Sequence, residues 1–450
     1  MNIGATRTGN GAAVQARWGR IAAWCLYDWA TAPFHTLVAT FVFSVYFTKA
    51  VVGDPVRGAA LWGSAMGAAG IVIAVASPVL GAIADSSGRR KPWIAGFTTL
   101  VVLATATLWR VAPTPASIPL ALGAAALGAV ATELAHVFYN ALLPAVAPSR
   151  LLGRVSGWGW GSGYASGLIV LLLALALLIK TDHPLFGLLG TDAQQGVRAS
   201  NLLVALWMAL FVLPLFRWVP DRADKGLAPG AAVRQGLSTL AATVRGLPRR
   251  PDILRFLVAS ALWRDGIATL VQFGGIFAAT EFGMEPGQII LFAIILNVSA
   301  GLGAAVMAWA DDRFGAKRVL VISLLGLILS GGGMVLVGTR AGGFLPPLGL
   351  PIPFSGDQQW LLLLGLGLGA CFGPAQAAAR SLMARLSPPG LEAEMFGLYA
   401  LSGRAVSALG PLAYGAATAA FASQRAGMAT VLALFLAGLA LLLPLREQRV

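Results

Sequence analysis

The chain is poor in charged residues and in cysteine, and each shortage excludes a class of protein. Only 11% of its 450 residues are charged, whereas a soluble domain averages about 25%. So few charges cannot cover a water-exposed surface, which excludes a soluble protein. The two cysteines, Cys25 and Cys371, lie inside apolar runs, so the sequence predicts neither a disulfide framework nor a metal site.

Motifs of nucleotide and metal enzymes are absent as well. The sequence contains no GxxxxGK[ST] loop and no HExxH pair, which are the patterns that hold phosphates and catalytic zinc. The Gly-rich run GWGWGSG at 157–163 lies in an apolar segment, where glycines are typical of close helix packing. We therefore interpret the chain as a protein that is not an enzyme and needs no cofactor.

Long apolar runs dominate what is present. The chain is 57% hydrophobic with a mean hydropathy of +0.78, and runs long enough to cross a bilayer, about 20 residues, recur throughout. The expected fold class is an all-α polytopic membrane protein with 12 transmembrane helices. They are expected near 21–48, 58–84, 92–112, 117–146, 153–179, 199–217, 252–280, 287–310, 316–338, 358–384, 394–422 and 426–445.

The formal charge of +14 reflects topology rather than a nucleic-acid partner. Most Lys and Arg residues fall in the loops on the side of the N-terminus, and such an excess marks the cytoplasmic side of a membrane protein. We expect both termini in the cytoplasm. Because no long tails flank the spans, a bacterial inner membrane is the favoured location.

The longest polar stretch, 217–252, is expected to be a cytoplasmic linker because it carries seven basic residues. An amphipathic surface helix is expected within it, near 231–246. The predicted organisation is therefore a cytoplasmic tail, two six-helix bundles and the linker between them. The corresponding ranges are 1–20 for the tail, 21–217 for the first bundle, 218–251 for the linker and 252–450 for the second bundle.

The two halves resemble each other. Sliding the chain by 240 residues aligns 135–165 with 375–405 and gives eight identical pairs in 31 positions. A second repeat relates GAIADSSGRRK at 81–91 to AWADDRFGAKR at 308–318 with an offset of 227. The two offsets, 240 and 227, differ by 13 residues, and a longer outer loop at 340–357 in the second half fits this difference. Parallel duplicated halves are typical of transporters in which one half rocks against the other.

These loops resemble the signature Gly-x-x-x-Asp-x-x-Gly-Arg-Lys/Arg of the major facilitator superfamily, which implies two pseudo-symmetric six-helix bundles. The first copy fits fully, and the second has Ala308 and Ala316 in place of a Gly and an Arg. The stretches LYDWATAPF at 26–34, FYNALLP at 138–144 and GRVSGWGWGSGY at 153–164 resemble the vacuole-effluxer-like branch. Fungal members of that branch export amino acids from the vacuole.

The resemblance also implies a conformational latch at the two loops. Asp85 is expected to face the N-terminus of span eleven, where a helix dipole favours negative charge, and Asp312 is expected to face span five. The alternative, that Arg-rich loops only set topology, does not account for both Asp-x-x-Gly spacings. The predicted latch residues are Gly81, Asp85, Gly88, Arg89, Arg90, Lys91, Asp312, Gly315, Lys317 and Arg318.

Several polar residues interrupt the predicted spans, where a charged side chain costs about 2.5–3.5 kcal/mol and usually faces a bundle interior or a water-filled cavity. Asp28 and His35 share one face of span one, and Glu133, His136 and Asn140 form a stripe on span four. The 240-residue offset places polar positions of one half on polar positions of the other, as expected for a shared central cleft. Those pairs are His136 with Gln376, Asn140 with Arg380, and Tyr164 with Arg404.

On span seven, Arg264 and Asp265 are adjacent and therefore point about 100° apart, with Gln272 on the stripe of Asp265. The predicted substrate-binding or proton-binding residues are Asp28, His35, Glu133, His136, Asn140, Arg264, Asp265, Gln272, Gln376, Arg380 and Arg404. Three alternatives stay open: Asp28 and Glu133 form structural pairs with Arg404 or Arg264, Arg380 is a snorkelling end residue, and His35 is a satisfied core histidine.

These residues predict a secondary active transporter that works by alternating access. Fixed cations such as Arg264 and Arg404 suit a substrate carboxylate, and buried carboxylates with histidines suit a proton relay. A small polar or charged solute, best an amino acid or related organic acid, is therefore the expected substrate, with proton coupling and a monomeric protein in the bilayer. A multidrug or lipophilic-compound exporter and a non-transporting membrane sensor or scaffold are the alternatives.

Overall fold

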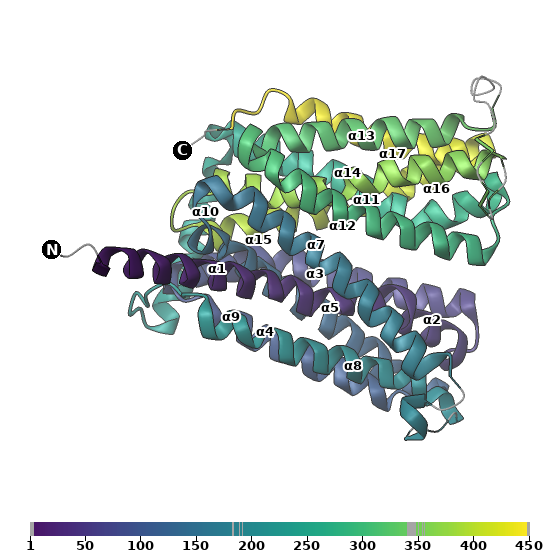
Figure 1. The fold of residues 1–450 in the computed structure, drawn as a ribbon, viewed down its shortest axis with the longest axis horizontal. Coiled ribbons are helices and arrows are strands. Elements are labelled where there is room, and N and C mark those ends of the chain that lie inside the picture. The colour runs from purple at the N-terminus through teal and green to yellow at the C-terminus, as the bar shows by residue number, and fades with distance from the viewer. Residues whose placement is uncertain are drawn as a thin grey trace. The chain divides into compact units, whose positions relative to one another are not determined.

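A computed structural model describes residues 4–181, 184–188, 190, 192–339, 348–349, 351–352, 354 and 356–447, and they are predominantly helical (Figure 1). Helices are the expected outcome because a bilayer offers no water to the backbone, so each N–H and C=O must bond within its own segment. Most of the predicted outer loop at 340–357 lies outside the described residues.

Ten of the described helices are long and apolar enough to span a membrane, and each coincides with one of the twelve expected spans. Their helical cores are α1 (Gly4–Pro33), α3 (Pro55–Ser87), α4 (Lys91–Thr107), α5 (Ile118–Ala141), α7 (Leu152–Ala174), α8 (Gln195–Phe211), α12 (Pro286–Phe314), α13 (Ala316–Leu336), α14 (Gly356–Leu386) and α17 (Gln424–Leu442).

The other two expected spans are present as helices of a different kind. Span seven is α11 (Pro251–Phe282), which is long enough but is made less apolar by Arg264, Asp265 and Gln272. Span eleven is divided into α15 (Glu392–Ala405) and α16 (Leu409–Phe421). Each piece is shorter than a bilayer-spanning helix, so the break at 406–408 is a feature that the apolar pattern did not predict.

The chain forms two compact units. Unit 1 contains Met1–Ser149, Ser162–Leu240 and Pro388–Gly397, and unit 2 contains Arg150–Gly161, Ala241–Ser387 and Leu398–Val450. The boundary between Leu240 and Ala241 falls inside the segment expected to be the linker, and the expected domain ranges stay a prediction. The first turns of α7 and of α15 each belong to the unit formed mainly by the other half of the sequence, for reasons given below.

In unit 1, α4 packs against α5 and α8, and α5 also packs against α3. The first span continues beyond Pro33 through the π-helical turns Phe34–Phe41 and Phe47–Val51, with the short α2 (Phe43–Tyr46) between them. The predicted tail at 1–20 is helical from Gly4 onward, because no proline interrupts the helix before the first span.

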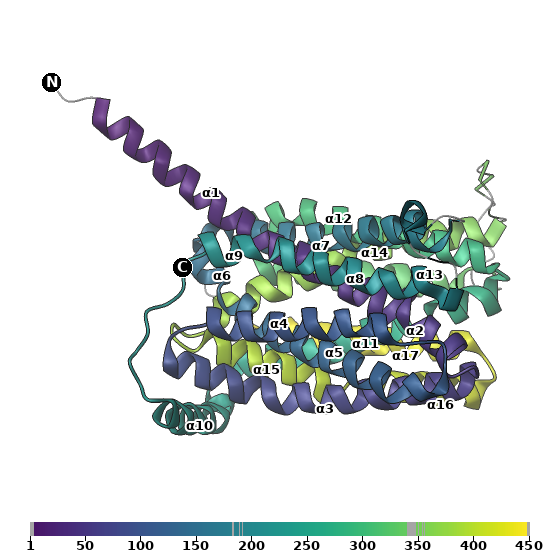
Figure 2. The same ribbon diagram turned by 90° about the horizontal axis from the view of Figure 1, so that it is seen from below.

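The linker begins after the short α9 (Leu213–Trp218) and contains α10 (Pro229–Gly246), where an amphipathic helix was expected. Within unit 1, Figure 2 shows α10 nearly end-on beside the end of α3, so α10 runs across the direction of α3. The two helices touch where Gly236 meets the backbone of Ile83. This orientation is typical of a helix that lies along a membrane surface.

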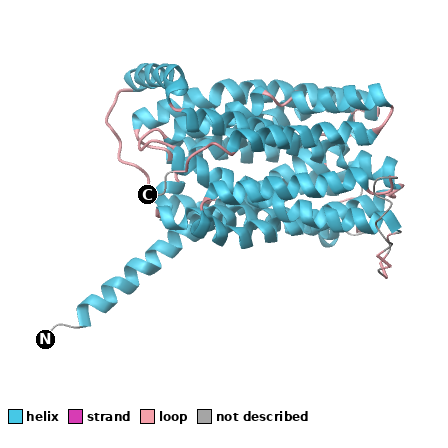
Figure 3. Ribbon diagram, turned by 90° about the horizontal axis from the view of Figure 1, so that it is seen from above, coloured by secondary structure: helices cyan, strands magenta, loops and turns pink. Residues whose placement is uncertain are grey.

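In unit 2, α14 packs against both α12 and α13, and α17 packs against α11, α13 and α16. Glycine permits the close approach of α12 and α14, because a Cβ added to Gly303 would clash with the backbone of Ala370. Small residues at helix contacts are expected in membranes, where close packing replaces the hydrophobic drive. Figure 3 shows helices and loops, and the described residues contain no strand.

Candidate substrate and proton site

A histidine on α5 faces a carboxylate on α1 within unit 1. The Nε2 atom of His136 lies 4.0 Å from Oδ1 of Asp28 and 3.3 Å from the hydroxyl oxygen of Thr31. Its other ring nitrogen, Nδ1, lies 2.9 Å from the carbonyl oxygen of Thr132, one turn earlier on the same helix. Two of these residues, Asp28 and His136, are predicted site residues, whereas the sequence analysis did not single out Thr31.

The hydrogen bonds fix which nitrogen of His136 carries the hydrogen in the neutral ring. A carbonyl oxygen can only accept, so Nδ1 carries a hydrogen and donates it to Thr132, and the neutral ring presents the lone pair of Nε2. The Thr31 hydroxyl has a second partner, the Tyr27 carbonyl 3.0 Å away. Because Thr31 donates to Tyr27, its oxygen is left to accept, and Nε2 of His136 faces both that oxygen and Asp28.

Aromatic rings hold this pair in place. Tyr27 stacks on Tyr139 with centroids 4.6 Å apart, and both rings meet His136 edge-on at 6.0 and 5.9 Å. The Tyr27 hydroxyl shares a hydrogen bond with Thr98 at 2.8 Å. The side chain of His136 nevertheless stays 21% exposed, so the ring is both oriented and accessible.

The remaining predicted residues of unit 1 lie around this pair. His35, in the π-helical turn after Pro33, is exposed and its ring centroid is 6.3 Å from that of His136. Glu133 and Asn140 flank His136 along α5 and are half-buried. The structure thus brings the two histidines together, and the roles of His35, Glu133 and Asn140 stay predictions.

In unit 2, Arg264 and Asp265 turn to different partners, as their adjacency on a helix requires. Nη1 of Arg264 donates to the carbonyl of Tyr399 at 3.0 Å, and its guanidinium lies 4.3 Å from the centre of the Tyr399 ring. A cation over an aromatic face is stabilised by the ring quadrupole. Arg264 of α11 is therefore a fixed, half-buried positive charge that contacts α15.

Asp265 lies at the break between α15 and α16. It is 2% exposed, and its Oδ2 accepts a hydrogen bond from the backbone N–H of Gly410 at 2.6 Å. Gly410 is in the first turn of α16, where backbone N–H groups lack helical partners and favour a negative charge. Asp265 thus caps α16 from a different helix, which is a structural role that the sequence analysis did not assign.

Arg380 is held inside unit 2 and is not a snorkelling end residue. It is 4% exposed, and it donates from Nε to the hydroxyl of Ser156 at 2.9 Å and from Nη2 to the Ser156 carbonyl at 2.6 Å. Its guanidinium also lies 5.6 Å from the ring centre of Trp160. Gln376 and Arg404 are half-buried and Gln272 is exposed; substrate roles for these residues stay predictions.

A buried ion network, here called the first turn network, surrounds the turn between α3 and α4 in unit 1. Nη2 of Arg90 donates to Asp85 at 2.5 Å and to Glu392 at 2.7 Å, and Arg222 of the linker donates to the same Glu392 at 2.7 Å. Asp85 also accepts from the N–H of Glu394 in the first turn of α15 at 2.9 Å. Burial alone would lower the pKa of Arg90, but the attraction of Asp85 and Glu392 outweighs it and raises that pKa.

The neighbours of Arg90 do not pair with Asp85. The exposed Arg89 approaches Asp224 at 4.0 Å, and Nζ of Lys91 donates to the carbonyl of Phe216 at 2.9 Å. Gly81 packs against the backbone of Ala393. Gly88 ends α3 with φ +93°, a conformation that glycine adopts without the cost of a Cβ clash.

The second turn network surrounds the turn between α12 and α13 in unit 2 and divides its charges between two arginines. Asp312 accepts from the N–H groups of Gly153 at 2.9 Å and Arg154 at 3.3 Å, in the first turn of α7, and from Nε of Arg154 at 2.6 Å. The neighbouring Asp311 accepts from Arg385 at 2.6 Å and also from the hydroxyl of Ser381. These contacts place the start of α7 in unit 2, just as Asp85 places the start of α15 in unit 1.

Two further carboxylates occupy matching positions. Asp221 accepts from the backbone N–H groups of Arg90 and Lys91 at 2.9 and 3.1 Å. Glu447 accepts from those of Ala316 and Lys317, each at 3.0 Å. The two acids therefore cap α4 and α13 from the segments that follow spans six and twelve.

The other latch residues of unit 2 surround the same turn. Gly315 has φ +96°, Lys317 donates from Nζ to the Leu443 carbonyl at 2.6 Å, and Arg318 lines a nearby cavity. Sequence analysis missed several members of the networks, although the repeat offers a signal: Asp221 and Glu447 are 226 residues apart, as are Lys91 and Lys317. The missed residues are Asp221, Glu392, Asp311, Arg385, Glu447 and Arg154.

Within the described residues, no group of three or more His, Cys, Asp or Glu side chains could hold a metal ion. The acidic side chains of the two networks are instead engaged by arginines, backbone N–H groups and a serine hydroxyl.

Comparison with known proteins gives relatives among membrane transporters. The chain is 24% identical to an uncharacterised MFS-type transporter, YxiO, of Bacillus subtilis over 427 residues, covering 93% of each chain. It is 29% identical to the autophagy-related protein 22-1 of Aspergillus fumigatus over 288 residues, covering 60% of this chain and 44% of the fungal protein. The chain therefore matches less than half of that fungal relative.

Solved structures show the same fold. The Escherichia coli fucose:proton symporter FucP matches with a TM-score of 0.70 at 14% identity, covering 96% of this chain and 98% of the symporter. The proton:xylose symporter XylE matches with a TM-score of 0.68 at 12% identity, covering 95% of each chain. The family described as vacuole effluxer Atg22 like matches residues 65–450, and since that is most of the chain, the protein belongs to this family of major facilitator superfamily transporters.

Proposed function

We propose that the protein is a proton-coupled secondary transporter of an amino acid or a related organic acid, and that His136 with Asp28 forms its proton site. Membership of a transporter family supports the general function. Proton coupling and the substrate class are proposals that rest on the polar residues inside the spans.

The observation that carries the proposal is the orientation of His136. Its Nδ1 is engaged with Thr132, while Nε2 faces Asp28 at 4.0 Å, beyond hydrogen-bond range. Nε2 also meets the hydroxyl of Thr31 at 3.3 Å, and that hydroxyl can accept from a protonated Nε2 because it donates to the Tyr27 carbonyl. Here a proton arriving at Nε2 gains a carboxylate neighbour, and the 21% exposure of the side chain leaves a route for that proton.

Arg264 and Arg404 are proposed as the groups that bind a substrate carboxylate. Both lie inside predicted spans and are half-buried, and a guanidinium stays charged in either conformation of a transporter. Arg264 is already oriented by Tyr399. Fixed cations and titratable acids within the spans suit a zwitterion, whereas a lipophilic-compound exporter would not need the arginines.

Asp85 and Asp312 are proposed as the acids of a conformational latch. Each accepts hydrogen bonds from the first turn of a long helix, α15 for Asp85 and α7 for Asp312. Releasing such a cap removes a favourable charge–dipole interaction, which is a plausible energetic step for a moving helix. The proposal also keeps both termini cytoplasmic, as the arrangement of Lys and Arg predicts, and treats the working unit as a monomer.

The proposal is tested with the full-length protein in liposomes that carry a pH gradient. We expect a screen of labelled amino acids and organic acids to reveal uptake that is accompanied by proton movement. Asp28→Asn and His136→Gln should each reduce gradient-driven uptake by about ten- to hundredfold, the usual range of a coupling free energy of 1–3 kcal/mol. Exchange of substrate without a gradient should persist, because the substrate groups are intact.

The control is Asp192→Asn, which removes an exposed carboxylate and should leave coupling unchanged. Gradient-driven uptake that survives both site variants would overturn the proton site. Arg264→Ala and Arg404→Ala separate the substrate classes: loss of amino-acid exchange supports the proposal, and undiminished export of lipophilic compounds with no amino-acid transport contradicts it.

A further inference from the structure

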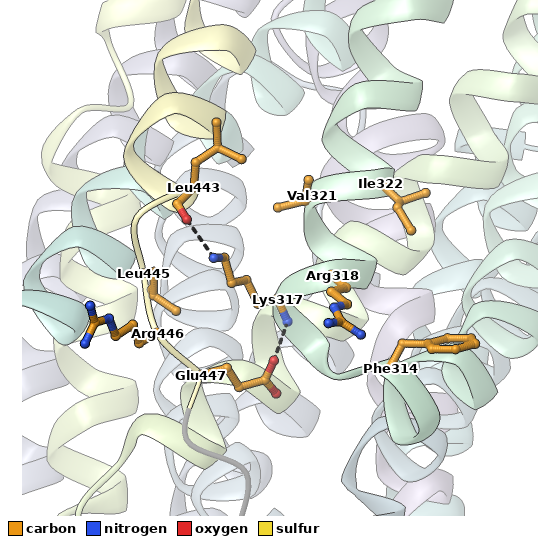
Figure 4. A pocket seen from close by; sticks show the side chains of 9 residues that line it. All are labelled: Phe314, Lys317, Arg318, Val321, Ile322, Leu443, Leu445, Arg446 and Glu447. Carbon is orange, nitrogen blue, oxygen red and sulfur yellow. Dashed lines mark hydrogen bonds between the residues drawn. The ribbon is translucent and has the colours of Figure 1, made fainter.

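A cavity of about 560 Å³ lies in unit 2 between the first turns of α13 and the segment that follows α17 (Figure 4). It differs from the candidate transport site in its residues and in its character, because basic and apolar side chains share its walls. The residues that the argument uses are Lys317, Arg318, Val321, Ile322, Arg446 and Glu447.

The cavity carries excess positive charge. Its acid, Glu447, already accepts hydrogen bonds from the N–H groups of Ala316 and Lys317 and from Arg385 at 3.0 Å, so its negative charge is compensated. Within the part of the chain that the structure describes, the guanidinium groups of Arg318 and Arg446 have no ion-pair or hydrogen-bond partner. Two cations are thus left to bind an anion.

The third cation, Lys317, extends towards the end of α17. Its Nζ donates to the carbonyl of Leu443 at 2.6 Å, and Figure 4 shows this bond across the cavity from Arg318. An ammonium group has three hydrogens to donate. Lys317 can therefore keep this bond and still donate to a bound anion.

The wall along α13 is apolar. Val321 and Ile322 follow Arg318 by about one helical turn, and Ile322 is 53% exposed. Since α13 is a candidate span that begins at Ala316, the cations lie at the expected membrane boundary and Ile322 lies about 6 Å deeper, at 1.5 Å per residue. Cations at the boundary above an apolar wall match a molecule with an anionic head and an acyl chain.

The duplicated half shows that these cations are not required by the cap itself. Judged by their cap contacts, Lys91 corresponds to Lys317 and Asp221 to Glu447. In this register, which differs by one residue from the loop repeat with its offset of 227, Pro92 corresponds to Arg318 and Pro220 corresponds to Arg446. The first half thus makes the same cap without either arginine.

We propose that this cavity binds the phosphate head group of an anionic membrane phospholipid through Lys317, Arg318 and Arg446, with an acyl chain along Val321 and Ile322. The inference goes beyond transport and does not depend on the substrate. Because the site adjoins the cap of α13 and the second turn network, the bound lipid would stabilise unit 2.

The test uses the purified full-length protein and phosphatidylglycerol, with phosphatidylcholine of the same acyl chains for comparison. Retention of each lipid is measured by native mass spectrometry, and the melting temperature is measured with and without lipid. Arg318→Gln and Arg446→Gln should each weaken phosphatidylglycerol binding about fivefold, since a basic residue near the bilayer contributes about 1 kcal/mol towards an anionic lipid. The double variant should lose roughly thirtyfold, with little change for phosphatidylcholine.

Two matched variants keep the result interpretable. The double replacement Arg318→Lys with Arg446→Lys keeps both charges and should bind phosphatidylglycerol within about twofold of the natural chain. Arg249→Gln removes an exposed arginine elsewhere in unit 2 and should have no effect. Melting temperatures without lipid identify any variant that fails to fold. If a Gln variant fails to fold, phosphatidylglycerol binding by the Lys double variant still tests whether positive charge at these two positions is enough for binding.

A competition experiment with inorganic phosphate distinguishes a lipid head group from free phosphate. If phosphate alone stabilises the protein and displaces phosphatidylglycerol at similar concentrations, the cavity is a site for free phosphate and the lipid proposal is wrong. Equal binding of the two lipids, or an equal loss in Arg249→Gln, would also overturn it. Selective loss in the Gln variants, with retention in the Lys variant, would support it.

Discussion

The first and second turn networks grow from the same repeated loop but distribute their charges differently. In the first, Arg90 is 1% exposed and contacts both Asp85 and Glu392. In the second, Arg385 serves Asp311 and Glu447 while Arg154 serves Asp312. The side chain of Arg154 is 36% exposed, against 13% for that of Arg385.

The two loops thus share their geometry, but their ion pairs differ in burial. Both loops deliver an aspartate to the first turn of a helix, and in each network one arginine serves two acids. That arginine is more deeply buried in the first network, where the side chain of Arg90 is 1% exposed, than in the second, where that of Arg385 is 13% exposed. A buried charge that loses its partner is costly because it cannot be re-solvated. The first network should therefore be the more fragile of the two.

The largest expected effect is that of Arg90→Gln. It leaves Asp85 and much of Glu392 without their buried counter-charge, so we expect the free energy of unfolding to fall by about 3–5 kcal/mol. The measurement is an unfolding titration of the purified protein in mixed micelles. The neighbouring exposed Arg89→Gln is the control and should change the value by less than about 0.5 kcal/mol; similar losses in both variants would refute this dependence on burial.

A smaller loss is expected for Arg385→Gln, about 2–3 kcal/mol in the same titration. The reason is that Asp311 keeps the hydroxyl of Ser381 and Glu447 keeps two backbone N–H groups. If Arg385→Gln proved as damaging as Arg90→Gln, the proposed difference between the two networks would be wrong.

The smallest effect is expected at the two caps. Asp221→Ala and Glu447→Ala each remove an acceptor from two N–H groups at the start of a helix, which typically costs about 1 kcal/mol. The two variants should be equal within about 0.5 kcal/mol if the caps are equivalent. A much larger loss at Glu447 would show that its bond to Arg385 dominates, and would sharpen the contrast between the halves.

Much of the fold could be predicted from the sequence because the bilayer imposes a length and an apolar composition on each span. The expected boundaries of α3, α5 and α13 are close to those observed. The break between α15 and α16 was not predicted, because it depends on the cap that Asp265 supplies from α11. Periodicity within span eleven contains no trace of that contact.

For the same reason the sequence singles out some residues of the candidate site, whose roles stay predictions. Asp28 and His136 are recognisable as charges in apolar runs, but the roles of Thr31 and Thr132 in orienting His136 depend on a contact between helices. Likewise Asp265 and Arg380, predicted as ligand-binding groups, have partners in the structure that position α16 and α7. The sequence identifies the residues whose burial in a membrane costs free energy, and only three-dimensional contacts show which interactions offset that free energy.

The assignment of Pro388–Gly397 to unit 1 has a consequence for biosynthesis. Glu392 and the N–H of Glu394, which complete the surroundings of Arg90 and Asp85, are made some 140 residues after the linker ends. At 5–20 residues per second, the ribosome needs on the order of ten seconds or more to supply them. The amino-terminal half must therefore wait in the membrane, with Glu392 not yet beside Arg90, until more than half of the carboxy-terminal half has been translated.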